Sequence, residues 1–191
     1  AMGISINEYL VSVYIWSVYT ECLHGMPSKC PIRVAVPVNL RPYFNSITTK
    51  NFFVMVSAEF HPTKETYTFA EVAAIVKESL RSQINRENLE KLFSYNVSNE
   101  KLLIARVVPL FLKNLAMKYV YTTSALANTA TITNIGNISV TEEYRPYVEM
   151  FHAFLAMSKG QHLKGTICSY GDTLVFSFSY DLVDASVQRG F

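Results

Sequence analysis

The pattern of apolar and polar positions predicts helices at two capping boxes. Ser5-Ile6-Asn7-Glu8 predicts a helix that begins at Ser5, ends near Leu23 and is apolar nearly all round, so it is expected to be deeply packed. Thr68-Phe69-Ala70-Glu71 predicts a second helix, which lies on the surface of a sheet. Its expected apolar stripe consists of Phe69, Val72, Ile75, Val76 and Leu80, and its solvent-exposed residues are Lys77, Glu78 and Arg81.

Two apolar runs between these helices predict strands over residues 32–38 and 52–60. In the second run every other residue from Phe52 to Phe60 is apolar, which places one face of that strand in the core. Pro37 has no amide donor, so the first strand is expected to lie at a sheet edge or to end there.

The middle of the chain predicts further helices. Residues 86–100 are polar, with apolar positions at helical spacing, which indicates a short helix followed by a loop. Residues 102–121 are helical in period, but Pro109 removes an interior hydrogen bond, so a kink or two helices are expected. If this apolar segment is exposed, it offers a face to a partner.

From Ser124 to Asp181 the period becomes two, which predicts strands over residues 129–134 and 148–154 and a hairpin over residues 165–181. Tyr170-Gly171-Asp172 is the hairpin turn, and Asp184 caps a final helix. This order predicts an α+β fold: a two-layer sandwich of helices on a mixed, largely antiparallel sheet, in a single domain of residues 1–191.

Composition narrows the function. Of the 191 residues, 50% are apolar, 13% aromatic and only 17% charged, which indicates surface that belongs against a partner or another domain. A net charge of +2, with scattered basic residues, argues against nucleic-acid binding. The sequence has no run long enough for a membrane span and no signal peptide, so a cytoplasmic protein without a membrane span is expected.

The chemistry-bearing residues assemble no active site. The three cysteines lack the spacing of a zinc site or a disulfide framework and are interpreted as buried free thiols. The four histidines are separate, and His24, His61 and His162 are interpreted as structural. A hydrogen-bonded core position is favoured for His152 over a catalytic one, and an inert thiol is favoured for Cys168. No catalytic residue and no metal site are therefore assigned.

Four motifs remain. Val36-Pro37-Val38-Asn39-Leu40-Arg41-Pro42 ends a strand, and Lys50-Asn51-Phe52-Phe53 opens the next one. Thr133-Asn134-Ile135-Gly136 and Ser177-Phe178-Ser179-Tyr180-Asp181 follow in the same order and spacing as in a known family. Together they resemble the C-terminal half of the CoA-dependent acyltransferases, which include chloramphenicol acetyltransferase, peptide-synthetase condensation domains and, most similar of all, bacterial alcohol acetyltransferases.

The resemblance implies that Arg41, Asn51, Thr133, Asn134 and Gly136 line a channel for CoA and the acceptor. For Arg41 the choice is between steering an anionic CoA group and bracing the loop through a structural ion pair, with the second favoured. Lys50 replaces the usual glycine before Asn51, which weakens the assignment of Asn51. An Asn-x-Gly turn at the end of a strand is the alternative reading of residues 133–136.

In the family the general base is the second histidine of His-His-x-x-x-Asp in the N-terminal half, and this chain lacks that motif. The resemblance thus implies the C-terminal subdomain of a CoA-dependent O/N-acyltransferase, inactive alone. It implies no tightly bound cofactor, acetyl-CoA or another acyl-CoA as co-substrate of the full-length protein, and the N-terminal subdomain of the same polypeptide as partner. The alternative is a non-catalytic binding or dimerisation module of the same fold, forming a homodimer. An unrelated enzyme that uses His152 or Cys168 is a more distant third option.

Overall fold

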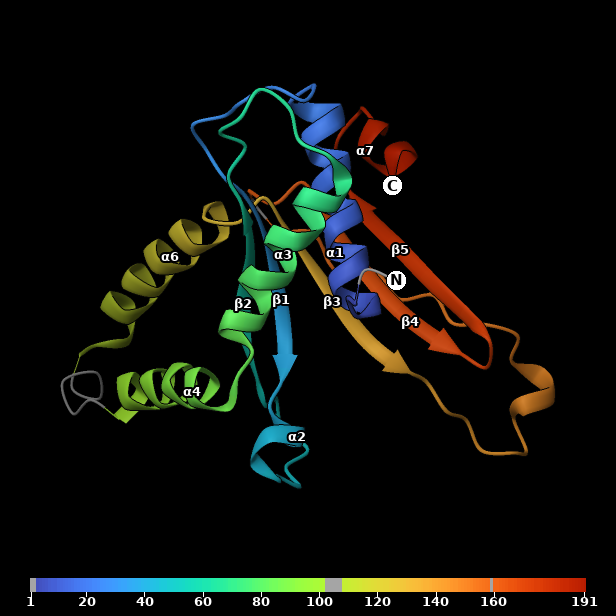
Figure 1. The fold of residues 1–191 in the computed structure, drawn as a ribbon. Coiled ribbons are helices and arrows are strands. Elements are labelled where there is room, and N and C mark those ends of the chain that lie inside the picture. The colour runs from blue at the N-terminus through green and yellow to red at the C-terminus, as the bar shows by residue number, and fades with distance from the viewer. Residues whose placement is uncertain (1–2, 102–107, 159) are drawn as a thin grey trace.

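The computed structural model describes residues 3–101, 108–158 and 160–191 (Figure 1). Its helices and strands follow an α+β order, as the sequence predicts. The elements are α1 (Ile6–Ser17), the π-helical turn η1 (Val18–Cys22), β1 (Ile32–Asn39), α2 (Arg41–Phe44), β2 (Phe53–Phe60), α3 (Phe69–Gln83), α4 (Arg86–Lys101), α6 (Leu110–Leu126), β3 (Ala130–Asn137), the 3-10 turn η2 (Arg145–Tyr147), β4 (Leu163–Tyr170), β5 (Thr173–Tyr180) and α7 (Ser186–Gly190).

The strands form one mixed sheet in the order β2-β1-β3-β4-β5. The outer pairs, β1 with β2 and β4 with β5, are antiparallel along their whole length. The inner pairs, β1 with β3 and β3 with β4, are parallel. The predicted hairpin is confirmed, because Tyr170 pairs with Thr173 across the turn and Gly171 adopts a φ of 56°.

Helices α1 and α3 lie beside one another on one face of the sheet (Figure 1). Both predicted capping boxes are present: Ser5 and Glu8 bond reciprocally at the start of α1, and Thr68 and Glu71 do so at the start of α3. The core lies between these helices and the sheet, and burial of its large apolar side chains drives folding. Its largest fully buried side chains are Tyr14, Tyr19, Phe60, Ile15, Leu40, Leu89, Ile132, Ile167, Val11, Val34, Val56 and Val72.

The opposite face of the sheet is crossed by the irregular segment that precedes β4. The ammonium of Lys164 donates to the carbonyl of Ala156 at 2.8 Å, and the ring of Phe151 meets that of Tyr170 at 5.4 Å. The sequence predicts a strand over residues 148–154, and this prediction is wrong, since these residues form no strand. From Phe151 to Leu155 partly buried residues alternate with exposed ones, and the exposed ones include His152 and Phe154.

The middle of the chain also departs from expectation. Residues 86–100 were expected to end in a loop, but α4 continues as one helix to Lys101. At Pro109 the expectation was a kink or two helices; a helix, α6, begins directly after it, and the carbonyl of Pro109 accepts the amides of Leu112 and Lys113 in the first turn. The predicted helix over residues 102–107 lies outside the described residues. In Figure 1, α4 and α6 extend away from the sheet on the β2 side.

Candidate functional site

Strands β1 and β3 separate soon after they meet, and this opening is the centre of the candidate site. They pair only at Val34 with Ala130 and at Ala35 with Thr131. The carbonyl of Arg33 accepts the amide of Thr129, the residue before β3, and the amide of Arg33 donates to Thr129 Oγ1. Both groups of Arg33 thus face the β3 side, and so does the nitrogen of Pro37, four residues on. Proline cannot donate there, and no described strand is paired with it on that side. The expectation that β1 lies at the sheet edge or ends at Pro37 is therefore wrong. Pro37 lies in the part of this inner strand that is paired on one side, with β2, and no longer with β3.

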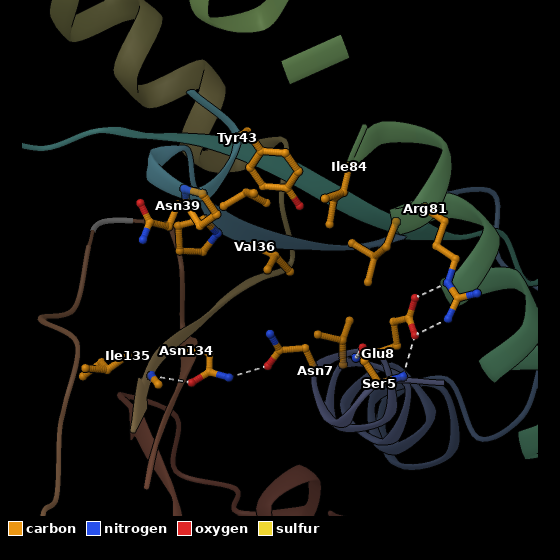
Figure 2. A pocket seen from close by; sticks show the side chains of 16 residues that line it. Ser5, Asn7, Glu8, Val36, Asn39, Tyr43, Arg81, Ile84, Asn134 and Ile135 are labelled. Carbon is orange, nitrogen blue, oxygen red and sulfur yellow. Dashed lines mark hydrogen bonds and ion pairs between the residues drawn. The ribbon is translucent and has the colours of Figure 1, made fainter. Parts of the chain in front are cut away.

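Two pockets adjoin the opening, one on each face of the sheet. The helix-side pocket, of about 490 Å³, lies between β1, β3, α1 and α3 (Figure 2). The open-face pocket, of about 470 Å³, lies between β1, β2, β3 and the loop of residues 49–52. Pro37, Asn39 and Asn134 line both pockets, so the two adjoin where β1 and β3 diverge.

All five residues taken from the resemblance lie on the walls of these pockets. Arg41, Asn51 and Thr133 line the open-face pocket, Gly136 lines the helix-side pocket, and Asn134 lines both. Residues separated by more than eighty positions are thus brought together by the parallel pairing of β1 with β3.

Arg41 braces the loop that leads to β2. Its guanidinium donates to the carbonyl of Thr48 from Nε at 3.1 Å and from Nη2 at 3.0 Å, and Nη2 also donates to the carbonyl of Lys50 at 2.8 Å. Asn39 Oδ1 accepts from the amide and the guanidinium of Arg41. The bracing role was expected, but it is carried by carbonyl and amide oxygens rather than by an ion pair.

Asn134 is turned toward α1 by a bulge in β3. The pairing with β4 slips between Asn134 and Gly136, and Gly136 takes a φ of 86°, which favours glycine. Asn134 Oδ1 accepts the amide of Gly136 at 2.7 Å, and Asn134 Nδ2 donates to Asn7 Oδ1 at 2.6 Å. The Asn-x-Gly sequence therefore bulges the strand, which continues to Asn137, rather than ending it.

One ion pair in the helix-side pocket was missed by the sequence analysis, which expected Arg81 in solvent. Arg81 donates from Nε to Glu8 Oε1 at 2.6 Å and from Nη2 to Glu8 Oε2 at 3.1 Å (Figure 2). The side chain of Glu8 is only 10% exposed. The Arg81 hydrogen bond, opposed by burial and helped by the amide and hydroxyl of Ser5, lowers the pKa of Glu8 to about 2.

The lowered pKa of Glu8 predicts acid sensitivity. The folded-state pKa of about 2 lies below the ordinary glutamate pKa of 4.5, so the stabilisation is complete above pH 5 and is lost as the pH falls toward 2. Glu8→Gln is expected to lower the free energy of unfolding by about 2 kcal/mol at pH 7 and by much less near pH 2. Urea unfolding across this pH range measures the difference.

The matched control is Glu87→Gln, because Glu87 forms an exposed ion pair with Lys91 within one helix. It is expected to change stability little at any pH. A Glu8→Gln deficit that stays the same from pH 7 to pH 2 would contradict the role of the carboxylate charge.

No histidine lines either pocket among the described residues. His61 bonds to Glu59, and His162 Nδ1 lies 2.9 Å from Asp181 Oδ1 on the surface. The prediction of a buried, mid-strand His152 is wrong: it is exposed on the irregular segment, with Nε2 3.2 Å from the sulfur of Met150. No described group of His, Cys, Asp and Glu could hold a metal ion.

The three cysteines were expected to be buried free thiols, and only Cys168 is buried. Cys168 is buried in β4, with Sγ 3.2 Å from the carbonyl of Phe151. Cys22 and Cys30 are exposed, against expectation: Cys22 is the last residue of η1, and Cys30 lies in the loop before β1.

The comparisons with known proteins leave the family open. No protein-family model matches the chain, and a search of curated proteins found no significant match. Of the helices described, none has both the length and the apolar character needed to cross a membrane.

Proposed function

We propose that this chain is the C-terminal subdomain of a CoA-dependent O/N-acyltransferase similar to the alcohol acetyltransferases. In this proposal it forms one wall of the channel for acyl-CoA and acceptor, and the open-face pocket is the CoA side of that wall. The N-terminal subdomain of the same polypeptide supplies the base. Acetyl-CoA or another acyl-CoA is the co-substrate.

The observation that carries the proposal is the gathering of the five resemblance residues at one opening in the sheet. Arg41, Asn51, Thr133, Asn134 and Gly136 come from two distant parts of the chain, yet they line two adjoining pockets. Ligands of sheet proteins commonly bind where neighbouring strands diverge.

The charge of the open-face pocket supports the same ligand. Arg41 and Lys50 line this pocket, and none of its lining residues is a carboxylate. Phosphate groups are attracted to such cationic edges. The apolar part of the wall, which includes Phe53, Met55 and Leu155, suits the less polar part of a thioester ligand.

A non-catalytic module that dimerises is the second candidate, and α6 is the feature that favours it. This helix contains no acidic residue, and its large apolar side chains are exposed. Phe111 is 70% exposed, Leu115 67% and Tyr119 74%. Surface of this kind is typical of an interface, and in the acyltransferase proposal it belongs against the N-terminal subdomain.

An acyl-transfer assay tests the missing base. The purified chain is expected to transfer no acetyl group from acetyl-CoA to alcohols or amines above the uncatalysed rate. General-base catalysis needs a free base, and the carboxylate that lines these pockets, Glu8, is held in its ion pair with Arg81. His152→Ala and His162→Ala are expected to leave this baseline unchanged. Release of free CoA thiol measures the rate.

The proposal of a missing base is overturned if the chain shows acceptor-dependent transfer that His152→Ala abolishes. Light scattering during size-exclusion chromatography measures the oligomeric state and so distinguishes the dimerisation module from the acyltransferase subdomain. A tight dimer that Tyr119→Glu dissociates, in a chain that fails to bind acetyl-CoA, favours the dimerisation module.

A further inference from the structure

The helix-side pocket has its own ligand chemistry, distinct from that of the open-face pocket. Its inner wall is apolar: Val11 and Leu80 are buried, and Val36, Ile84 and Tyr43 are partly exposed at the opening. Its volume of about 490 Å³ falls in the range of small-molecule sites. Its polar groups come from the start of α1 and the bulge of β3.

The amide orientations at this pocket are fixed by the hydrogen bonds of the backbone. The amide of Gly136 needs an acceptor, so the oxygen of Asn134 faces it and the nitrogen of Asn134 faces Asn7. Asn7 must then accept with its oxygen. Figure 2 shows the nitrogen of Asn7 turned toward Val36, across the pocket.

This pair leaves a donor to a ligand. Each of its two oxygens already accepts one hydrogen bond, while Asn7 Nδ2 has no acceptor among the described residues. An N–H group can bind only an acceptor atom, such as a carbonyl oxygen.

The charge of the pocket is neutral. Glu8 and Arg81 are the charged residues among those that line it, and they neutralise one another in a bidentate ion pair. A ligand with a net charge would gain no unpaired partner here and would lose hydration on entry. This pocket thus contrasts with the open-face pocket, where Arg41 and Lys50 are not matched by a carboxylate.

We propose that the helix-side pocket binds a small uncharged carbonyl compound, such as a ketone, ester or amide with an apolar chain. The carbonyl oxygen accepts from Asn7 Nδ2 beside Asn134, and the chain lies against Val11, Val36 and Ile84. The inference rests on the geometry of this pocket alone and does not depend on the acyltransferase proposal.

A matched set of probes tests the ligand class on the full chain. We expect 2-octanone to give saturable shifts in ¹H–¹⁵N spectra at the side-chain amides of Asn7 and Asn134 and at the backbone of Val36 and Ile84. Octylammonium and octanoate, with similar chains, are expected to bind at least about tenfold more weakly, since a charged group loses its hydration without gaining a partner.

Asn7→Asp tests the role of the Asn7 Nδ2 donor, because aspartate has no side-chain N–H group. The aspartate keeps an oxygen to accept from Asn134 and favours the first turn of α1, so the fold is retained. It is expected to weaken 2-octanone binding about tenfold, through the loss of one hydrogen bond, and to strengthen octylammonium binding. Asn137→Asp makes the same change at an exposed residue of β3 that lines neither pocket, and it is expected to leave 2-octanone binding unchanged.

The proposal is overturned if 2-octanone gives no saturable shifts at these residues up to its solubility limit. It is also overturned if Asn7→Asp changes the ketone affinity by less than about threefold, where the lost hydrogen bond predicts tenfold. Octylammonium or octanoate binding as tightly as the ketone would reject the neutral ligand class. Acetyl-CoA takes no part in the experiment, so its result is separate from that of the acyl-transfer assay.

Discussion

Phe60→Ala is expected to lower the free energy of unfolding by about 3–5 kcal/mol. Phe60 is fully buried at the end of β2, where its ring meets Tyr19 edge-on at 5.6 Å and Tyr67 at 4.9 Å. Removing the ring leaves a cavity between the sheet and the C-terminal part of the first helix, and it also removes both aromatic contacts. Urea or thermal unfolding measures the loss, which is a large fraction of the stability of an ordinary domain.

Phe53→Ala is the matched control, because it removes the same side chain from the other end and the other face of β2. Phe53 is 48% exposed, so its removal leaves no closed cavity and is expected to cost less than about 1 kcal/mol. Equal losses for the two variants would mean that the core does not lie on the helix side of β2.

Gly165→Val is expected to destabilise the protein by about 3 kcal/mol through overpacking. A Cβ atom at this position of β4 would lie 2.6 Å from Phe176 Cζ and 3.2 Å from Ile132 Cγ1. The ring of Phe176 cannot swing aside freely, since it packs against Phe178 at 4.8 Å and Phe191 at 4.2 Å. The measurement is again equilibrium unfolding, with near-ultraviolet circular dichroism to report on the aromatic cluster.

A second substitution tests the cause of this loss. Phe176→Leu removes the ring atoms that the new side chain would meet, so the double variant is expected to lose less than the sum of the single variants. Strictly additive losses would show that Gly165 is required for another reason than the approach of Phe176.

Local patterns predicted the elements whose ends are set by neighbouring residues. Both capping boxes satisfy their own backbone amides within four residues, and the turn at Gly171 needs only a positive φ. The prediction failed for residues 148–154, whose alternation is that of a strand but whose backbone joins no sheet. A strand also needs a partner at a sheet edge, whereas this segment lies over the face of β4, where Phe151 meets Tyr170 and its carbonyl accepts from Cys168.

The candidate site shows the same division. The motifs placed polar residues at strand ends, but the opening between β1 and β3 follows from strand order, which no local pattern contains. For Arg41 the sequence left two roles open, steering CoA and bracing the loop. Its hydrogen bonds to the carbonyls of Thr48 and Lys50 depend on the conformation of that loop, which the sequence does not show. The pair of Glu8 with Arg81 joins residues 73 positions apart through the packing of α1 on α3.

The proposal that this chain forms a wall of an acyl-CoA channel is tested most directly by titrating the ¹⁵N-labelled chain with acetyl-CoA. Saturable shifts are expected at Asn51, Thr133 and Asn134, weakened by salt and by Lys50→Glu. Lys29→Glu, at an exposed lysine that lines neither pocket, is the control and is expected to leave the affinity nearly unchanged. An absence of shifts at the open-face pocket at millimolar acetyl-CoA, or equal effects of the two lysine variants, would contradict the proposal.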